Sequence, residues 1–239
     1  MLVLGIDTSG YANAVGVTDG EKVLADLTFP AKTDSLEQIV ANIDDALKCA
    51  GLTLEDIGGI GVGLGPGSWT GIRVGVTVGK VLAFSTGKPL AGIPTLEVLA
   101  YQAIVEASLV CAVIPTGAGD AVYAACYQLQ AGVVGRVGDY FIGSVKDLTG
   151  MIKEPVVLAG DTGASYMQTL RDGIIKAGIA VTNITAVPGG AAVARLASER
   201  LERGERADVL GLEPLYLKES TARAFVNRYA AKTKGWGGS

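Results

Sequence analysis

The residues best suited to chemistry begin with Asp7-Thr8-Ser9, which follows the apolar run Leu2–Ile6. A carboxylate beside two hydroxyls at the end of a strand can hold Mg²⁺ and phosphate. A similar turn ends the later run Leu109–Ile114, but Pro115 stands where the matching carboxylate would be. Because proline cannot bind a metal, we expect no catalytic residue here and a structural role for Asp7, capping the hairpin turn.

The remaining candidates for a nucleotide site are weak. They are Asp7 and Thr8 in the first turn, with Gly160 and Gly163 in the second half. Gly160-Asp161-Thr162-Gly163 could be a vestigial nucleotide loop or a plain strand-to-helix turn, and both interpretations stay open. The stretch Gly75–Lys80 is one residue too short for a Walker phosphate loop. We therefore predict no bound cofactor.

The chain contains no histidine. This excludes Ser-His-Asp triads, His-ligated zinc and histidine acid–base chemistry. Cys49, Cys111 and Cys126 are odd in number and lack CxxC spacing. They indicate reduced core residues in a cytoplasmic protein, with no metal site.

Composition predicts an α/β protein. The 239 residues are 49% hydrophobic and include 34 glycines, so the core is expected to be tight and built from small aliphatic side chains. The net charge of −4 gives no general attraction to nucleic acid. No apolar run reaches membrane-spanning length, and Met1–Asp7 lacks the basic region of a signal peptide.

The elements that must position these residues centre on residues 61–79. Gly61, Gly63 and Gly65 alternate in a predicted strand, so one face is bare and another element must approach it closely. Ser68 is placed to cap the next helix. In that helix the glycines recur every fourth residue, at 71, 75 and 79, and form one flat stripe. We expect a helix or a sheet to lie tightly on this stripe.

The rest of the chain predicts the same plan twice. Three short strands and a helix capped by Asp34 open the first half, and Thr95 is placed to cap a helix over 96–107. The second half again begins with strands and ends with a clear helix at Ala191–Arg203. We predict two tandem βββαβα lobes, at 1–107 and 108–218, with mixed sheets flanked by helices. A basic tail follows at 219–239.

At four places the sequence resembles the bacterial TsaB (YeaZ) proteins. The matching stretches are Ile6-Asp7-Thr8-Ser9, Asp34-Ser35-Leu36, Gly65-Pro66-Gly67-Ser68-Trp69-Thr70-Gly71-Ile72-Arg73-Val74-Gly75 and Gly92-Ile93-Pro94-Thr95-Leu96. The GPGS[FW]TG[LI]R block is quite specific, whereas Gly160-Asp161 and residues 214–218 fit more loosely. The chain departs from the family pattern at Asp34, where histidine is usual, and at the turn Thr116–Gly119.

The resemblance implies an actin/RNase H-like fold and a role without catalysis. TsaB proteins pair with the related catalytic subunit TsaD. With TsaE and the threonylcarbamoyl-AMP synthase they install threonylcarbamoyladenosine next to the anticodon of tRNA. In isolation, members of the family tend to form homodimers through the same helices that TsaD uses. Contact with tRNA is expected to be indirect.

On this basis the predicted site is a partner interface on two helices. The candidates are Leu36, Ile39, Ile43, Ser68, Trp69, Thr70, Gly71, Arg73, Gly75, Val76 and Gly79. An alternative packs the glycine stripe on the protein's own sheet, in which case Gly75→Leu would unfold the monomer instead of weakening a complex.

Two other functions stay open from sequence. One is a nucleotide-binding, kinase-like enzyme of the actin-like superfamily. The other is direct RNA binding by the tail, whose only charged residues from Ser220 onward are basic: Arg223, Arg228, Lys232 and Lys234. The competing interpretation of the tail is a helix that packs on its own lobe or on the partner.

Overall fold

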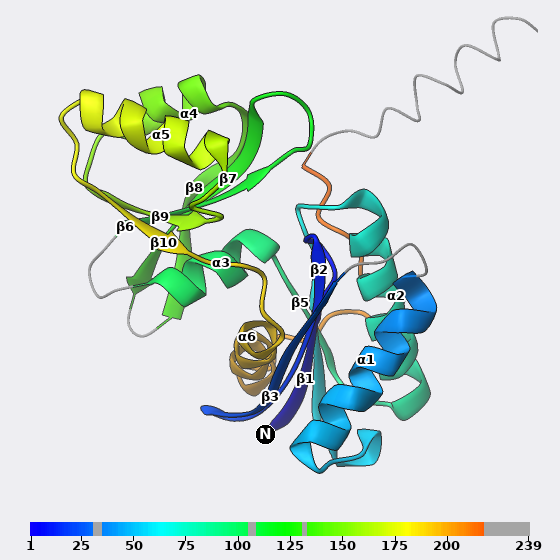
Figure 1. Ribbon diagram of the computed structural model, residues 1–239. Helices are drawn as coiled ribbons and strands as arrows, with labels where there is room; N and C mark the ends of the chain where they lie inside the picture. Colours follow the sequence, from blue (N-terminus) through cyan, green and yellow to red (C-terminus); the bar gives the residue numbers. More distant parts are fainter. Residues whose placement is uncertain (31–34, 105–108, 131–132, 218–239) are drawn as a thin grey trace, which may run out of the picture.

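The chain folds into two lobes, each built on a five-stranded mixed sheet (Figure 1). The computed structural model describes residues 1–30, 35–104, 109–130 and 133–217. The predicted cap Asp34 and the tail 219–239 therefore lie outside the described residues, as does the side chain of Leu36.

The first sheet has the strand order β3-β2-β1-β4-β5. Its strands are β1 (Leu2–Asp7), β2 (Ala12–Asp19), β3 (Lys22–Pro30), β4 (Gly59–Gly63) and β5 (Leu90–Ile93). The first three pair antiparallel, which confirms the predicted meander, and β4 and β5 join in parallel. The ends of β1, β4 and β5 therefore meet at one edge of the sheet.

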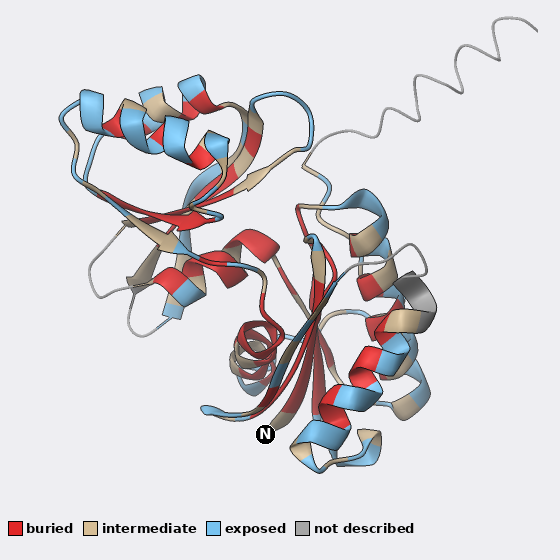
Figure 2. Ribbon diagram, viewed as in Figure 1, coloured by how far each residue is buried: buried red, intermediate tan, exposed pale blue. Residues whose placement is uncertain are grey.

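Helices cover both faces of this sheet. One face is packed by α1 (Ser35–Ala50) and α2 (Trp69–Thr86), with the short helix η1 (Leu54–Asp56) between them in the chain. The other face is packed by α6 (Gly190–Glu202), which comes from the far end of the chain. The buried positions lie on the strands and on the inner sides of these helices (Figure 2).

The second sheet repeats this topology in the order β10-β9-β6-β7-β8. Its strands are β6 (Leu109–Pro115), β7 (Ala121–Gln130), β8 (Val133–Ser144), β9 (Val156–Gly160) and β10 (Val181–Thr185). One face carries α4 (Val145–Met151) and α5 (Ser165–Lys176), and the other carries α3 (Thr95–Ala103). The duplicated fold is thus confirmed, although sequence patterns predicted neither α4 nor β10.

The lobes exchange their last helices. Helix α3 follows β5 in the chain but packs on the second sheet, whereas α6 follows β10 but packs on the first. A division near residue 107 therefore separates the two sets of strands and does not separate the helices. Because of this exchange, the chain passes from one lobe to the other twice, once before α3 and once before α6.

Bare glycines let α6 lie directly on the first sheet. A Cβ added to Gly5 or Gly16 would overlap the backbone of α6 at Gly190 and Ala191, and one on Gly61 would stand 2.6 Å from the Cβ of Ala197. The predicted close approach to the bare face of residue 61 is confirmed, and the approaching element is α6.

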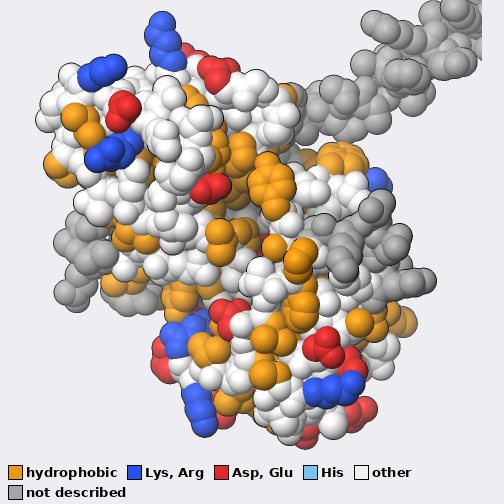
Figure 3. Space-filling model, in the orientation of Figure 1, with side chains coloured by type: hydrophobic (Ala, Val, Ile, Leu, Met, Phe, Trp, Pro, Cys, Tyr) orange, Lys and Arg blue, Asp and Glu red, His pale blue; other side chains and the backbone are white. Residues whose placement is uncertain are grey.

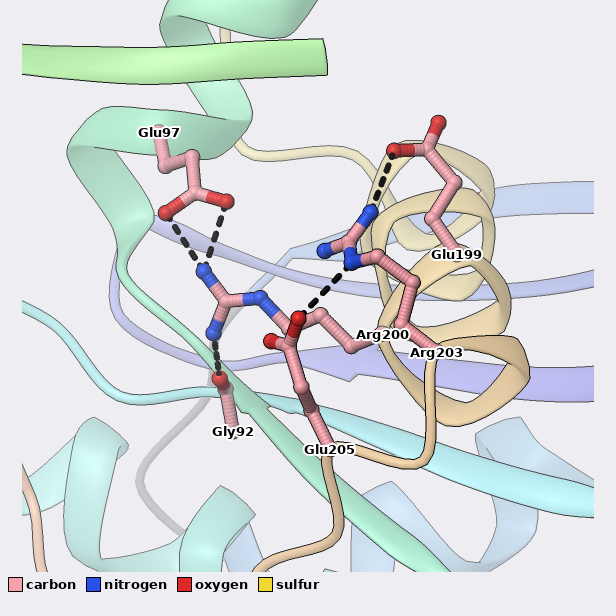
Figure 4. Close-up of polar contacts among 6 residues, drawn as sticks. All are labelled: Gly92, Glu97, Glu199, Arg200, Arg203 and Glu205. Atoms are coloured by element: carbon pink, nitrogen blue, oxygen red, sulfur yellow. Dashed lines mark hydrogen bonds and ion pairs between the residues drawn. The ribbon is translucent and has the colours of Figure 1, made fainter.

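An ion-pair cluster joins the exchanged helices (Figure 4). Arg200 of α6 donates from Nη2 to both carboxylate oxygens of Glu97 on α3, each at 2.7 Å, and from Nη1 to the Gly92 carbonyl of β5 at 2.5 Å. Burial raises the pKa of Glu97, and the neighbouring Arg200 opposes this shift. Arg203 pairs nearby with Glu205 and Glu199. The cluster therefore connects both lobes at the place where the helices cross.

Candidate functional site

Asp7 lies fully buried at the end of β1, and its carboxylate is held by its own chain. Oδ1 accepts hydrogen bonds from Ser9 N at 2.7 Å and Ser9 Oγ at 2.6 Å, and Thr95 Oγ1 lies 3.3 Å from Oδ2. Burial raises the pKa of Asp7, and the hydrogen bonds from Ser9 and Thr95 act in the opposite direction. Such contacts are those of a carboxylate that fixes a turn.

The Gly65–Ser68 loop closes over this turn. Ser68 N donates to Ser9 O at 2.7 Å, and the Thr8 hydroxyl donates to the Gly71 carbonyl at 2.6 Å. Gly65 has φ of 90°, which favours glycine. The β1–β2 turn, the loop and the start of α2 thus form one hydrogen-bonded unit.

Thr95 joins α3 to the same unit. It was predicted to cap the helix, but it is the first helical residue, and Pro94 holds the cap position without a side-chain bond. Instead the Thr95 hydroxyl accepts from Gly65 N at 3.1 Å and lies 3.1 Å from Ser9 Oγ. The prediction was wrong because this hydroxyl is buried against the Asp7 turn. Ser68 does cap α2, accepting from Gly71 N at 3.2 Å.

The glycine stripe of α2 faces the protein's own interior. A Cβ on Gly71 would overlap the Thr8 carbonyl, one on Gly75 would overlap Thr8 Oγ1, and one on Gly79 would lie 3.2 Å from Val62 Cβ. These three glycines therefore face residues of their own chain. The interpretation that packs the stripe on the protein's own lobe is the one that the structure supports.

Three other predicted interface residues are core residues. Ile39, Ile43 and Val76 are 0%, 5% and 3% exposed and belong to the cluster between α1, α2 and the first sheet. Helical spacing of apolar residues marks the buried side of an amphipathic helix. Spacing alone cannot distinguish this buried side from a surface that binds a partner.

The outer side of α2 exposes a different set of residues. Trp69, Val81 and Phe84 are 45%, 59% and 73% exposed, and Ser68, Thr70 and Arg73 are exposed as well. Sequence analysis missed Val81 and Phe84. Their spacing from Arg73, at intervals of eight and eleven residues, is a helical signal that could have found them.

A segment near the C-terminus, residues 205–217, runs along α2 and completes this surface. Lys80 Nζ donates to the carbonyls of Leu210 and Leu212 at 2.8 and 3.0 Å. The Tyr216 ring packs on Trp69 with centroids 4.3 Å apart, and the Arg73 guanidinium lies 5.5 Å from the Trp69 centroid. An open groove of about 330 Å³ lies between helix and segment. Its lining includes Arg73, Val76, Thr77, Lys80, Leu212, Glu213, Pro214 and Tyr216.

The second-lobe candidates also make contacts within their own chain. Asp161 Oδ1 accepts from Gly163 N at 3.0 Å, and Thr162 bonds to Thr185 through their hydroxyls. A Cβ on Gly160 would lie 2.6 Å from the Val113 carbonyl. These contacts are those of a strand-to-helix turn. In the described ranges, no three His, Cys, Asp or Glu side chains gather as a metal site would require.

Comparison with known proteins identifies the family. A family model described as "TsaD: tRNA N6-adenosine threonylcarbamoyltransferase" matches residues 30–223. The "tRNA threonylcarbamoyladenosine biosynthesis protein TsaB" of Bacillus subtilis is 31% identical over 228 residues, which cover 94% of this chain and 97% of that protein. The chain belongs to the TsaB (YeaZ) family.

Solved structures agree with this assignment of the TsaB-family chain. YeaZ from Pseudomonas aeruginosa superposes with a TM-score of 0.77 at 26% identity, covering 90% of this chain and 99% of that one. A ROK hexokinase from Thermus thermophilus superposes at 0.54 with 15% identity, covering 85% of this chain and 100% of the hexokinase. The second likeness shows the actin-like fold alone. Over the part of the chain that the structure describes, no helix is long and apolar enough to cross a membrane.

Proposed function

We propose that this chain is a non-catalytic subunit in tRNA threonylcarbamoyladenosine biosynthesis, which binds a TsaD-type catalytic subunit through the outer side of α2. The observation that carries the proposal is the exposure of large apolar side chains along one helix. Trp69, whose ring packs on Tyr216, lies at the start of α2, and Val81 and Phe84 lie toward its end. Large apolar side chains gathered on a surface are typical of protein interfaces.

The chemistry of this surface suits a protein partner. Trp69 and Tyr216 are aromatic residues of the kind enriched at interface centres, and Arg73 supplies a cation at the edge. An exposed apolar stripe on a helix can seat in a complementary helix groove. The match of a TsaD family model to this chain also supports pairing between two related folds.

The interior of the first lobe supports a role without catalysis. Both oxygens of the buried Asp7 carboxylate already face hydroxyl or amide donors of the same chain. On the face drawn in Figure 3, hydrophobic side chains run down the middle, where the lobes meet, and Lys and Arg lie around the periphery. A bound triphosphate needs cations or backbone amides close to its oxygens. The kinase-like alternative predicts that Asp7→Ala abolishes any ATP turnover of the pure protein.

The remaining partners follow from the same proposal. A TsaE-type ATPase would join the assembled pair, tRNA would be contacted through the catalytic subunit, and the complex would work in the cytoplasm. In the absence of the catalytic subunit, two copies of this chain would pair through the same side of α2 and form a homodimer.

The test is a binding titration of the purified chain with its TsaD-type subunit. Val81→Glu places a charge on the outer side of α2 and should weaken binding at least tenfold. Ile175→Glu is the matched control, since Ile175 is 49% exposed on α5 of the other lobe. If both variants bind as the unaltered chain does, the proposed interface is wrong.

A further inference from the structure

Two cysteines face each other across the central strands of the second lobe. The antiparallel register of β6 and β7 places Cys111 directly opposite Cys126. Residues paired in this way have Cα atoms about 4.5–5.5 Å apart and side chains on the same face. That separation lies within the range of about 4.4–6.8 Å found for disulfides.

The surroundings place both thiols on one face of the sheet. Cys111 belongs to the apolar cluster beneath α4 and α5, together with Val113 and Leu148, and Cys126 packs against that cluster. Cys111 is fully buried, whereas Cys126 is partly exposed. A reagent from solvent therefore has access to Cys126 first.

The pKa values of the two thiols shift in opposite directions. The neighbouring Cys111 thiol lowers the pKa of Cys126, and the proximity of Cys126 together with burial raises the pKa of Cys111. The charge of the exposed Glu154 opposes the shift at Cys126. Cys126 is thus the better nucleophile, and Cys111 keeps a proton beside it.

We infer that Cys126 and Cys111 are a peroxide-sensitive thiol pair that closes to a disulfide within the second lobe. The Cys126 thiolate attacks a peroxide oxygen, forming a sulfenic acid and releasing hydroxide. The Cys111 sulfur then attacks the sulfenic sulfur, and the hydroxyl leaves with the Cys111 proton as water. In total, two thiols and one hydrogen peroxide give one disulfide and two waters.

The disulfide would tie together the two strands that flank the turn Thr116–Gly119. Closing this hairpin limits the freedom of the unfolded chain, so the oxidised protein should unfold at a higher temperature. Cys49 supplies a contrast, because it was expected in the core but is an exposed thiol near the end of α1 on the first lobe.

The experiment uses the full chain carrying Cys49→Ser, reduced and then treated with hydrogen peroxide. Alkylation under denaturing conditions should find both remaining thiols before treatment and neither after it. Dithiothreitol should restore both. The intact mass should fall by two hydrogens, and a proteolytic digest should contain peptides joined through residues 111 and 126. Two alkylatable thiols after treatment, or added oxygen that the reductant cannot remove, would overturn the inference.

Single variants test the order of the two steps. With Cys111→Ser, Cys126 should stop at the sulfenic acid and be trapped by dimedone. With Cys126→Ser, the buried Cys111 should resist peroxide and remain alkylatable after unfolding. If Cys111 instead oxidises as fast without Cys126, then the assigned roles are wrong.

Discussion

A Cβ on Gly75 would stand only 2.3 Å from the Thr8 hydroxyl oxygen. The same hydroxyl donates to the Gly71 carbonyl at 2.6 Å, one turn earlier in α2. The two glycines thus let the β1–β2 turn sit directly on the helix backbone. This relationship, and not contact with a partner, explains why the helix tolerates residues that weaken it.

Gly75→Leu should therefore unfold the isolated chain. A side chain at residue 75 must displace Thr8, which is buried and hydrogen-bonded to the Gly71 carbonyl. We expect a loss of at least about 3 kcal/mol in the free energy of unfolding, measured by urea denaturation. Gly150→Ala is the control, because this glycine of α4 has open space where its Cβ would be. It should stabilise the chain by about 0.5–1 kcal/mol. A Gly75→Leu chain that stays as stable as the original but loses its partner would contradict this prediction.

Asp7 should give the stability of the chain a distinctive pH dependence. Burial raises its pKa in the folded state above the ordinary 3.8, so the folded chain binds this proton more tightly than the unfolded chain. The resulting stabilisation is present below pH 3.8 and is lost as the pH rises through the folded-state pKa. Asp7→Asn keeps an oxygen for Ser9 and cannot ionise. Its stability relative to the original chain should increase with pH, as followed by urea denaturation across a pH series.

A second substitution at Asp7 separates charge from hydrogen bonding. Asp7→Ala leaves the amide and hydroxyl of Ser9 without their acceptor in a buried place. It should cost about 1–3 kcal/mol at every pH, because an unpaired buried donor carries its full desolvation cost. If Asp7→Asn is as damaging as Asp7→Ala near neutral pH, then the carboxylate charge is needed and a cation must lie nearby.

The contact of Glu97 with Arg200 should stabilise the joined lobes. Their side chains are 12% and 24% exposed, so loss of either partner leaves a largely buried charge. Arg200→Met should cost roughly 2–3 kcal/mol, and a double-mutant cycle with Glu97→Gln should give a coupling of about 1 kcal/mol or more. Glu205→Gln is the control, because its pair with Arg203 is 55% and 40% exposed and should contribute less than about 1 kcal/mol. If Glu97→Gln and Glu205→Gln lower the free energy of unfolding equally, then burial does not distinguish the two ion pairs.

Strand patterns and turn chemistry predicted the duplicated topology. The apolar runs Leu2–Ile6 and Leu109–Ile114 predicted β1 and β6, and each pairs with the antiparallel strand that follows it. The exchange of α3 and α6 could not be predicted, because periodicity identifies a buried helix face without saying which sheet buries it. Strand β10 was missed because Val181–Thr185 is short and polar, with no fully buried residue.

The same limit explains the errors at the interface. Ile39 and Ile43 have helical spacing, but this spacing fits a core as well as a contact surface. The glycine stripe predicted a close neighbour correctly, and of the two interpretations left open the one within the protein's own lobe fits, since the neighbours are Thr8 and Val62. Such a contact depends on the assembled fold.

The segment 205–217 should support the outer side of α2, and Lys80→Met tests this directly. The Lys80 ammonium is the donor to the carbonyls of Leu210 and Leu212, so its loss should free the segment from the helix. The experiment is done in a Trp236→Phe background, in which Trp69 is the only tryptophan. Its fluorescence emission should shift as Tyr216 moves away. Tyr216→Ala should give a similar shift. Lys176→Met, a substitution on α5 of the other lobe, should leave the emission unchanged. If Lys80→Met leaves the Trp69 emission unchanged while Tyr216→Ala shifts it, then the bond of Leu215 N to the Leu64 carbonyl at 2.8 Å is enough to hold the segment.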